Sequence, residues 1–399
     1  MRVAIDVRPM QVESQYRGVG TYVRELLMQY LTRSREIILF AWPELPIGLD
    51  PQILSVCRVL ETPKTSNMPW SKSFGYKRDG LDNKEFFVNL AQNADLIHFT
   101  DPQDIRFGFP WEDVGVPRVI TVHDLMTITN ADHIFHGINI VKRQVVKQLY
   151  KSYVEHYKDV NGIITVSQFT ESVLRSVIKS GLPTVKAIWN GISDKYVLPY
   201  VAQVDEYRLQ RKLPAKFILH VGTLLGNKNV EALLKATAPM CPWPFVFAGP
   251  YSEEEQNYLA SKYPQQKIYW LGYVDKNELP MLYAAAYIFA FPSLMEGFGL
   301  PILDAMAVGT PVVCSNAASM PEVVGNAAVM FNPNNLTEIR NAIYGVMNNE
   351  NMRMQMRTRG LERAQHLSWR RTAETTWIAY EAFVEEYQRN KRRKQMNMR

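Results

Sequence analysis

The 399-residue sequence has few cysteines and no long uninterrupted apolar run. Its three cysteines, Cys57, Cys241 and Cys314, form no C-x-x-C pair, so the sequence indicates neither a disulfide framework nor a zinc site. The apolar run over residues 279–291 is interrupted by Pro280 and falls short of the roughly 18 residues that a spanning helix needs. We therefore expect a cytoplasmic protein that is soluble, or peripheral at the inner face of a membrane.

Several short catalytic motifs are also absent. The sequence contains no D-x-D, no histidine–acid cluster with metal spacing, no G-x-S-x-G and no G-x-x-x-x-G-K-[ST]. These absences disfavour divalent-metal, esterase and P-loop mechanisms, so we expect no metal and no cofactor. Asp6 and Arg8 stand where a signal peptide needs an apolar run, so we expect a first strand there and no export signal.

Positive charge is concentrated at one end of the sequence. The net charge is 45 − 39 = +6, and six basic residues follow the last acid, Glu386, so the rest of the chain is neutral. A neutral body argues against a nucleic-acid partner. The basic tail, residues 389–399, is either a solvated end or a weak contact for an anionic membrane. Its basic residues are Arg389, Lys391, Arg392, Arg393, Lys394 and Arg399.

The remaining composition is that of a globular α/β protein. The apolar fraction is 47% and the charged fraction 21%, and the length suits two or three domains. Short segments rich in β-branched and aromatic residues alternate with helical patterns, which predicts doubly wound parallel sheets. The predicted strands cover residues 3–7, 37–42, 96–99, 119–122, 163–166 and 185–189, then 217–221, 245–248, 268–271, 287–291, 311–314 and 328–331.

The helical patterns and a linker divide the chain. Apolar residues at three- and four-residue spacing predict helices over residues 20–31, 139–157 and 168–178, the last capped by Ser167. A weaker pattern over residues 192–214 predicts a linker between two Rossmann-like domains that face a central cleft.

We expect the first domain to cover residues 1–195 and the second to cover residues 196–375. Residues 376–399 would form a C-terminal helix and the basic tail. The last helix, about residues 370–389, has a broad apolar face that must pack on one of the two domains. This face consists of Trp377, Tyr380, Phe383, Val384 and Tyr387.

The most informative segment covers residues 291–314. A strand ends, glycines permit close backbone approach, and Pro301 suits the first turn of a helix. A helix N-terminus facing a cleft suits a diphosphate. Glu296 in the preceding loop can accept hydrogen bonds from sugar hydroxyls, and Asp304 in the helix can hold a ribose diol. The alternative is a tight turn with acidic residues that merely favour a helix start.

This segment resembles the E-x7-E region of the retaining glycosyltransferases of family four, which have the GT-B fold. Asp304 stands where the family usually has glutamate. The resemblance implies that Glu296 contacts the donor sugar and that the Phe298, Gly299 and Leu300 amides stabilise the diphosphate. It extends through residues 315–325, which include Glu322, and through residues 271–274, where Tyr273 and Val274 would bracket the nucleotide base.

A second loop, residues 220–229, lies between a predicted strand and helix. There Lys228 offers a point charge to phosphate oxygens; the alternative is a solvated lysine. The loop resembles the family's V-G-x-L-x-x-R-K-N, in which Gly222, Lys228 and Asn229 match and Asn227 stands where an arginine is common.

The first half contains two further matches. Gly18 and Gly20 open the first helix and resemble the family's glycine loop beneath the donor phosphates. His123, at a strand end within V-H-D-L, resembles the family histidine that lies against the donor sugar. Without the resemblance, a histidine at a strand end is more often structural.

The resemblance covers nearly all of residues 1–385 and implies a metal-independent, retaining hexosyltransferase. Its first domain would hold the acceptor and its second domain the donor. It would move a hexose from a nucleotide diphosphate sugar, with GDP-mannose as the first guess, to a glycan or lipid-linked acceptor in cell-surface polysaccharide synthesis. Two alternatives stay open. One is a nucleotide-sugar epimerase of the same fold, and the other is a non-catalytic sugar-binding assembly subunit.

Overall fold

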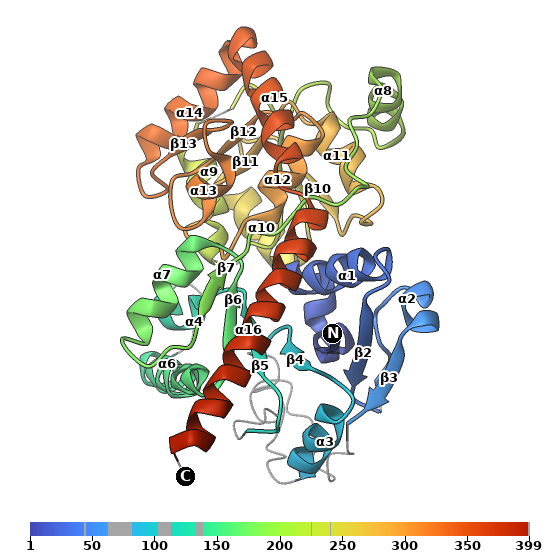
Figure 1. Ribbon diagram of the computed structural model, residues 1–399. Coiled ribbons are helices and arrows are strands. Elements are labelled where there is room, and N and C mark those ends of the chain that lie inside the picture. The colour runs from blue at the N-terminus through green and yellow to red at the C-terminus, as the bar shows by residue number, and fades with distance from the viewer. Residues whose placement is uncertain are drawn as a thin grey trace. The chain divides into compact units, whose positions relative to one another are not determined.

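The computed structural model divides into two compact units (Figure 1). Unit 1 comprises Met1–Leu125, Val145–Asn190 and Trp369–Arg399, and unit 2 comprises Met126–Gln144 and Gly191–Ser368. By its contacts the chain passes between the units after residues 125, 144, 190 and 368. The predicted domain boundaries after residues 195 and 375 stay predictions. The structure describes residues 1–43, 45–62, 82–102, 113–131, 139–224, 226–239 and 241–397.

The sheet of unit 1 is parallel, and within the described residues it has seven strands in the order β3-β2-β1-β4-β5-β6-β7. The first strands run outward in one direction from β1, and the later strands run in the other direction from β4, which is the doubly wound arrangement that we predicted. Ile5 of β1 pairs with His98 of β4, and Phe99 pairs with Ile120 of β5. The strands are β1 (Arg2–Asp6), β2 (Glu36–Ala41), β3 (Arg58–Glu61), β4 (Leu96–Phe99), β5 (Arg118–Val122), β6 (Gly162–Thr165) and β7 (Val185–Ala187).

Helices between these strands complete unit 1. Ser167 caps α7 as predicted, because its Oγ accepts a hydrogen bond of 3.0 Å from the Thr170 backbone N–H. The α-helices are α1 (Gly18–Leu31), α2 (Pro51–Val56), α3 (Asp82–Ala91), α7 (Gln168–Val177) and α16 (Trp369–Asn397); the 3-10 turns are η1 (Arg8–Gln11), η2 (Glu13–Tyr16) and η3 (His156–Asp159). Helix α6 (Ile140–Glu155) begins in the short segment of unit 2 and ends in unit 1.

Unit 2 repeats the same plan with a parallel sheet that, in the described chain, has six strands in the order β10-β9-β8-β11-β12-β13. Phe289 of β11 pairs with Leu219 of β8 on one side and with Val312 of β12 on the other. The strands are β8 (Ile218–Val221), β9 (Phe245–Ala248), β10 (Ile268–Gly272), β11 (Ile288–Phe291), β12 (Val312–Ser315) and β13 (Val329–Phe331).

The core of unit 2 lies between this sheet and its helices. Buried aromatic and aliphatic residues of β8, β9 and β11 pack against α9 and α14. The helices are α4 (Met126–Thr129), α8 (Val201–Gln210), α9 (Val230–Ala236), α10 (Glu253–Lys262), α11 (Leu279–Ala285), α12 (Leu300–Ala307), α13 (Met320–Val324), α14 (Leu336–Asn348) and α15 (Glu350–Gln365), with the 3-10 turn η4 (Gly226–Lys228). No helix in the described part of the chain is long and apolar enough to cross a membrane.

All the predicted strands are present, within one or two residues at each end, and the described residues contain one further strand that was not predicted. Strand β3 has the sequence Arg-Val-Leu-Glu and lies at the edge of the unit 1 sheet. Its outer residues are exposed and its inner residues only half-buried. An edge strand with two apolar residues carries too short a pattern to be recognised in the sequence.

The apolar face of α16 packs on unit 1. Phe383 lies against Gly162 of β6 so closely that a Cβ atom added at Gly162 would be 2.6 Å from the phenylalanine ring. Trp377 meets the Tyr30 ring at 5.3 Å between centroids, and Thr372 donates a hydrogen bond of 2.8 Å to the Trp189 carbonyl. The helix continues to Asn397, so the basic residues up to 397 form exposed helical turns and not an irregular tail.

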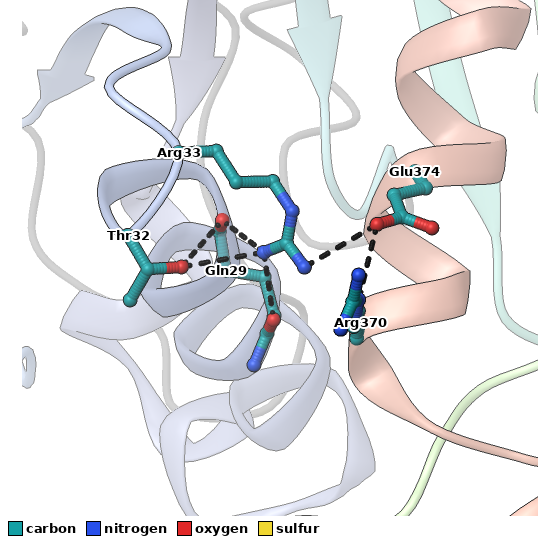
Figure 2. A network of polar contacts seen from close by, with 5 residues as sticks. All are labelled: Gln29, Thr32, Arg33, Arg370 and Glu374. Atoms are coloured by element: carbon teal, nitrogen blue, oxygen red, sulfur yellow. Dashed lines mark hydrogen bonds and ion pairs between the residues drawn. The ribbon is translucent and has the colours of Figure 1, made fainter.

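A polar network joins the end of α1 to the start of α16 (Figure 2). The Arg33 guanidinium donates hydrogen bonds of 2.8 and 2.9 Å to the backbone and side-chain oxygens of Gln29. It also lies 3.4 Å from the Glu374 carboxylate, which Arg370 contacts at 3.2 Å. Because these side chains are partly exposed, we expect a contribution of about 1 kcal/mol or less for each pair.

Candidate functional site

The candidate site of unit 2 lies where its strand order changes direction. Strands β8 and β11 are neighbours in the sheet, while β9 and β12 lie on their outer sides. The loops after β8 and β11 therefore separate at their shared edge, which is where open α/β sheets bind ligands. Lys228 follows β8 and Glu296 follows β11.

Lys228 and Glu296, two predicted catalytic residues, form an ion pair in this position. The Lys228 Nζ atom lies 2.7 Å from Glu296 Oε1, and the two side chains are 19% and 12% exposed. The same ammonium group lies 5.3 Å from the centre of the Phe291 ring. The pair therefore combines one cation and one carboxylate that are both largely shielded from water.

Asn227 links the two loops that carry this pair. Its backbone carbonyl accepts a hydrogen bond of 2.7 Å from the Leu294 N–H, and its Nδ2 atom lies 3.4 Å from the Met295 carbonyl. Asn227 is 6% exposed. Asn227, which stands where the family commonly has an arginine, is thus buried and joins the loops after β8 and β11 by hydrogen bonds.

Asn229 and Ser319 connect the two loops to neighbouring segments by hydrogen bonds to backbone carbonyls. The Asn229 side chain donates a hydrogen bond of 2.9 Å to the Pro333 carbonyl, and its φ of 54° is a left-handed conformation that asparagine tolerates. The fully buried Ser319 hydroxyl lies 2.9 Å from the Glu296 carbonyl and 2.8 Å from the Phe298 carbonyl. Ser319 was not among the predicted site residues, because a serine before a helix is normally read as a cap.

Helix α12 begins at Leu300, four residues after Glu296. Gly299 precedes it with a φ of 103°, a conformation that favours glycine, and Leu300 and Pro301 form its first turn. The start of the helix offers backbone N–H groups and the positive end of the helix dipole. Phe298 is buried beside it, and Asp304 lies half-buried in the next turn.

The other predicted donor-binding residues of unit 2 lie after neighbouring strands. Tyr273, which is 65% exposed, and Val274 follow β10, and Glu322 lies in α13 after β12. Gly222 follows β8, but its backbone N–H already donates a hydrogen bond of 3.0 Å to the Ala248 carbonyl. Its φ of 147° is a backbone conformation that residues other than glycine rarely adopt.

His220 is a further residue at this edge to which the sequence assigned no role. It is fully buried and stacks on Phe291, beneath the Lys228 ammonium. Its Nδ1 atom lies 3.2 Å from the Ala290 carbonyl, and a Cβ atom at Gly222 would lie 3.5 Å from its Nε2 atom. Burial, together with the Lys228 charge, lowers the pKa of His220 to about 4, so the imidazole is neutral.

In unit 1, His123 follows β5 as predicted. Its Nε2 atom lies 2.8 Å from the Thr100 carbonyl oxygen. Because a carbonyl only accepts, Nε2 carries the hydrogen. Burial lowers the pKa of His123 to about 4, so the ring is neutral at pH 7 and Nδ1 presents a lone pair. A group that binds Nδ1 must donate a hydrogen bond.

Gly18 and Gly20 form the first turn of α1 in unit 1. Gly18 is exposed and Gly20 is buried. A Cβ atom at Gly20 would lie 2.2 Å from the Gln15 carbonyl oxygen, so the packing of η2 against α1 already requires glycine there. The glycines are therefore helical and not part of a preceding loop, and the role at the donor phosphates stays a prediction.

Comparisons with known proteins cover both halves of the chain. The model described as Glycosyltransferase Family 4 matches residues 16–196, and the model described as Glycosyl transferases group 1 matches residues 204–363. O-antigen chain mannosyltransferase B of Escherichia coli is 32% identical over 275 residues, which cover 66% of this chain and 69% of that protein.

A longer relative and a solved structure match almost the whole chain. The serotype-specific mannosyltransferase WbdA of Escherichia coli is 26% identical over 416 residues, which cover 96% of this chain and 48% of that protein. This chain therefore spans about half of WbdA. The crystal structure of Anabaena Alr3699/HepE in complex with UDP and glucose has a TM-score of 0.69 at 17% identity and covers 96% of this chain and 100% of that chain. This likeness shows a shared fold.

Proposed function

Because the chain belongs to the group 1 glycosyltransferases and has their GT-B fold, we propose that it moves a hexose from a nucleotide diphosphate sugar to a glycan or lipid-linked acceptor. The transfer retains the anomeric configuration and uses no metal ion. The pathway class is cell-surface polysaccharide synthesis, as the names of the O-antigen relatives suggest.

The ion pair between Lys228 and Glu296 carries this proposal. A donor diphosphate attracts the Lys228 ammonium away from the carboxylate, since a phosphate oxygen is an equally good partner for it. The released Glu296 carboxylate then accepts hydrogen bonds from hydroxyls of the donor sugar. Donor binding in this way converts a neutral resting pair into two separate contacts, one for each half of the donor.

The residues around the pair suit the rest of the donor. The Phe298, Gly299 and Leu300 amides and the start of α12 stabilise the departing diphosphate, whose negative charge grows in the transition state. Asp304 holds the ribose diol, and Tyr273 and Val274 flank the base. Asn229, Gly222 and Glu322 shape the loops around the phosphates and the sugar.

His123 and the acceptor complete the mechanism. The neutral His123 ring accepts a hydrogen bond from a donor-sugar hydroxyl through Nδ1. The acceptor hydroxyl attacks the sugar from the side on which the nucleotide leaves, and a phosphate oxygen of the donor takes its proton. Catalysis then consists of positioning and of charge stabilisation at the leaving group.

The donor and the location follow from weaker observations. The named relatives are mannosyltransferases, which favours GDP-mannose, while the HepE structure holds UDP and glucose. The exposed basic turns of α16 after residue 388 suit weak contact with an anionic membrane that carries the acceptor. We therefore place the enzyme in the cytoplasm, peripheral to the inner face of the membrane.

The test compares GDP-mannose with UDP-glucose, each with and without a lipid-linked or oligosaccharide acceptor. We expect a new glycosidic bond only in the presence of an acceptor, without added metal, and with an anomeric configuration that matches the donor by NMR. A free isomerised sugar without acceptor would identify the epimerase alternative. The absence of transfer and of hydrolysis with either donor would favour the non-catalytic alternative and contradict the proposal.

A further inference from the structure

A buried chain of hydrogen bonds in unit 1 runs from α16 to α1 and plays no part in the proposed chemistry. The Tyr380 hydroxyl lies 2.6 Å from His98 Nδ1, and His98 Nε2 lies 2.8 Å from the Thr121 hydroxyl. The Thr121 hydroxyl lies 3.0 Å from the Tyr22 hydroxyl. None of these four residues is more than 1% exposed. We call them the tyrosine relay.

The protonation state of His98 limits the hydrogen bonds that this relay can form. Burial lowers the pKa of His98 to about 3, so its imidazole is neutral and has one N–H and one lone pair. It must therefore donate to one of its two neighbours and accept from the other. The hydroxyl groups of Tyr380 and Thr121 are ordered relative to each other, and every ring nitrogen in the relay has a partner.

The relay ends against His123. The Tyr22 and His123 rings form an edge-to-face pair at 84°, with 5.0 Å between the centroids. The Tyr22 ring also packs against Trp369 of α16, with 6.0 Å between the centroids. His123 is thus held by its hydrogen bond to the Thr100 carbonyl and by the Tyr22 ring, whose hydroxyl the relay anchors.

A polar relay is an unusual way to pack a helix on a sheet. Buried polar groups lose their hydration, and apolar side chains of similar size would pack α16 at no such cost. What a satisfied polar network adds is a single geometry, because each hydrogen bond is directional. At the α1 end of the relay, this geometry determines the position of the His123 ring.

We propose that Tyr22 is a positioning residue for His123, and that Tyr380 and His98 of the tyrosine relay set the orientation of Tyr22 through Thr121. The C-terminal helix thereby aims the Nδ1 lone pair of His123 at its ligand. That ligand is a hydrogen-bond donor, such as a hydroxyl group, and not a phosphate oxygen, to which a neutral Nδ1 cannot donate. Only the identity of the ligand as a donor sugar rests on the proposed function.

The test removes single hydroxyl groups and leaves the rings in place. Tyr22→Phe and Tyr380→Phe each break the relay at one end. Tyr387→Phe is the matched control, because it removes a hydroxyl group from the same helix. That hydroxyl donates a hydrogen bond of 2.7 Å to Asp113 and lies outside the relay. Histidines are labelled with ¹⁵N, and the His123 signals are assigned by their loss in His123→Gln.

We expect the His123 ring signals to shift in both relay variants and to stay unchanged in Tyr387→Phe. With the full donor, the relay variants should lower kcat/KM about tenfold, the scale of a small misplacement of a catalytic group, while the Kd of the free nucleotide diphosphate changes less than about twofold. The control should transfer sugar like the unaltered protein.

Unchanged His123 signals in a folded Tyr22→Phe protein would overturn the proposal, whatever the activity. If Tyr380→Phe does not fold, Tyr22→Phe at the other end of the relay gives the same decision. Shifted signals in a protein that transfers no sugar from any donor would contradict the proposed function and leave the positioning role of the relay standing. Equal loss of activity in Tyr387→Phe would also overturn the proposal, because it would show a general effect of disturbing α16.

Discussion

Lys228 Nζ lies 2.7 Å from Glu296 Oε1 although the two residues are 68 positions apart in the sequence. The strand order brings them together, because β8 and β11 are adjacent in the sheet. Neither charge is alone in the resting protein. A substitution of either residue therefore also affects its partner, because the remaining charge is shielded from water and has lost its counter-charge.

The first prediction concerns Lys228 as the diphosphate clamp. Lys228→Ala should weaken binding of the free nucleotide diphosphate by about 1.5–3 kcal/mol, the scale of a charge-assisted hydrogen bond. Calorimetry measures this affinity. Lys235→Ala, an exposed lysine on the adjacent helix α9, is the control and should leave the affinity unchanged. Equal affinity of Lys228→Ala and the unaltered protein would contradict the assignment.

The second prediction concerns Glu296 as a contact for the donor sugar. Glu296→Gln should lower kcat/KM for the full donor. The corresponding activation free energy should rise by about 2–4 kcal/mol, as expected for the loss of one preorganised hydrogen bond in the transition state. Affinity for the nucleotide alone should not fall, because Lys228 is freed from its partner. The exposed Glu254→Gln serves as control. Weaker nucleotide binding, or near-normal turnover, would show that Glu296 has another role.

The third prediction concerns Ser319, which supports the loop of Glu296. Ser319→Ala removes the hydroxyl that contacts two buried carbonyls and should lower the free energy of unfolding by about 1–3 kcal/mol. It should also lower kcat, because the loop of Glu296 loses its support. Ser315→Ala removes another buried hydroxyl, which contacts Ser293 at 2.5 Å, and should affect stability but not kcat. Similar kinetics of the two variants would argue against a role of Ser319 in the loop.

The fourth prediction concerns acid stability. Burial lowers the pKa values of His98, His123 and His220 to about 3, 4 and 4, whereas an unfolded histidine titrates near 6.5. Between pH 6.5 and 4 the unfolded chain binds more protons, so stability falls as the pH is lowered. At pH 5 these three groups together should contribute a slope of about 4 kcal/mol per pH unit.

Urea unfolding at pH 7, 6 and 5 measures this slope. The exposed His366→Gln should leave it unchanged, while His220→Phe should reduce it. Stability that does not change between pH 7 and 5 would contradict the buried neutral state of the three histidines.

The fifth prediction concerns the basic end of α16. A protein that ends at Gln388 keeps the contacts of Glu386 with Thr184 and of Tyr387 with Asp113, so it should fold normally. It should lose salt-sensitive binding to anionic vesicles, to which each basic residue adds about 1 kcal/mol, and keep activity on a soluble acceptor. Equal binding of both forms to the vesicles would show that these residues are only solvated.

The fold was predictable because each strand carries its own apolar signal, and β3 was missed because an edge strand shows little of it. Lys228, Glu296 and His123 follow strands, and their roles, which stay predictions, came from the resemblance to the family's motifs. Their partners were not predictable. That Lys228 pairs with Glu296, that Ser319 holds the Glu296 loop, and that Tyr380 reaches His98 all depend on strand order and helix packing. Such long-range contacts leave no periodic pattern in the residues themselves.

The return of the chain to unit 1 at Trp369 determines the order in which the protein is completed during synthesis. Residues 191–368 emerge from the ribosome as a continuous stretch, so most of unit 2 can fold while its last helix is being made. The packing of unit 1 stays incomplete until α16 has been synthesised. Before then, the surface around Tyr30 and Gly162 lacks its contacts with Trp377 and Phe383. This reverses the usual order, in which the N-terminal domain of a growing chain is finished first.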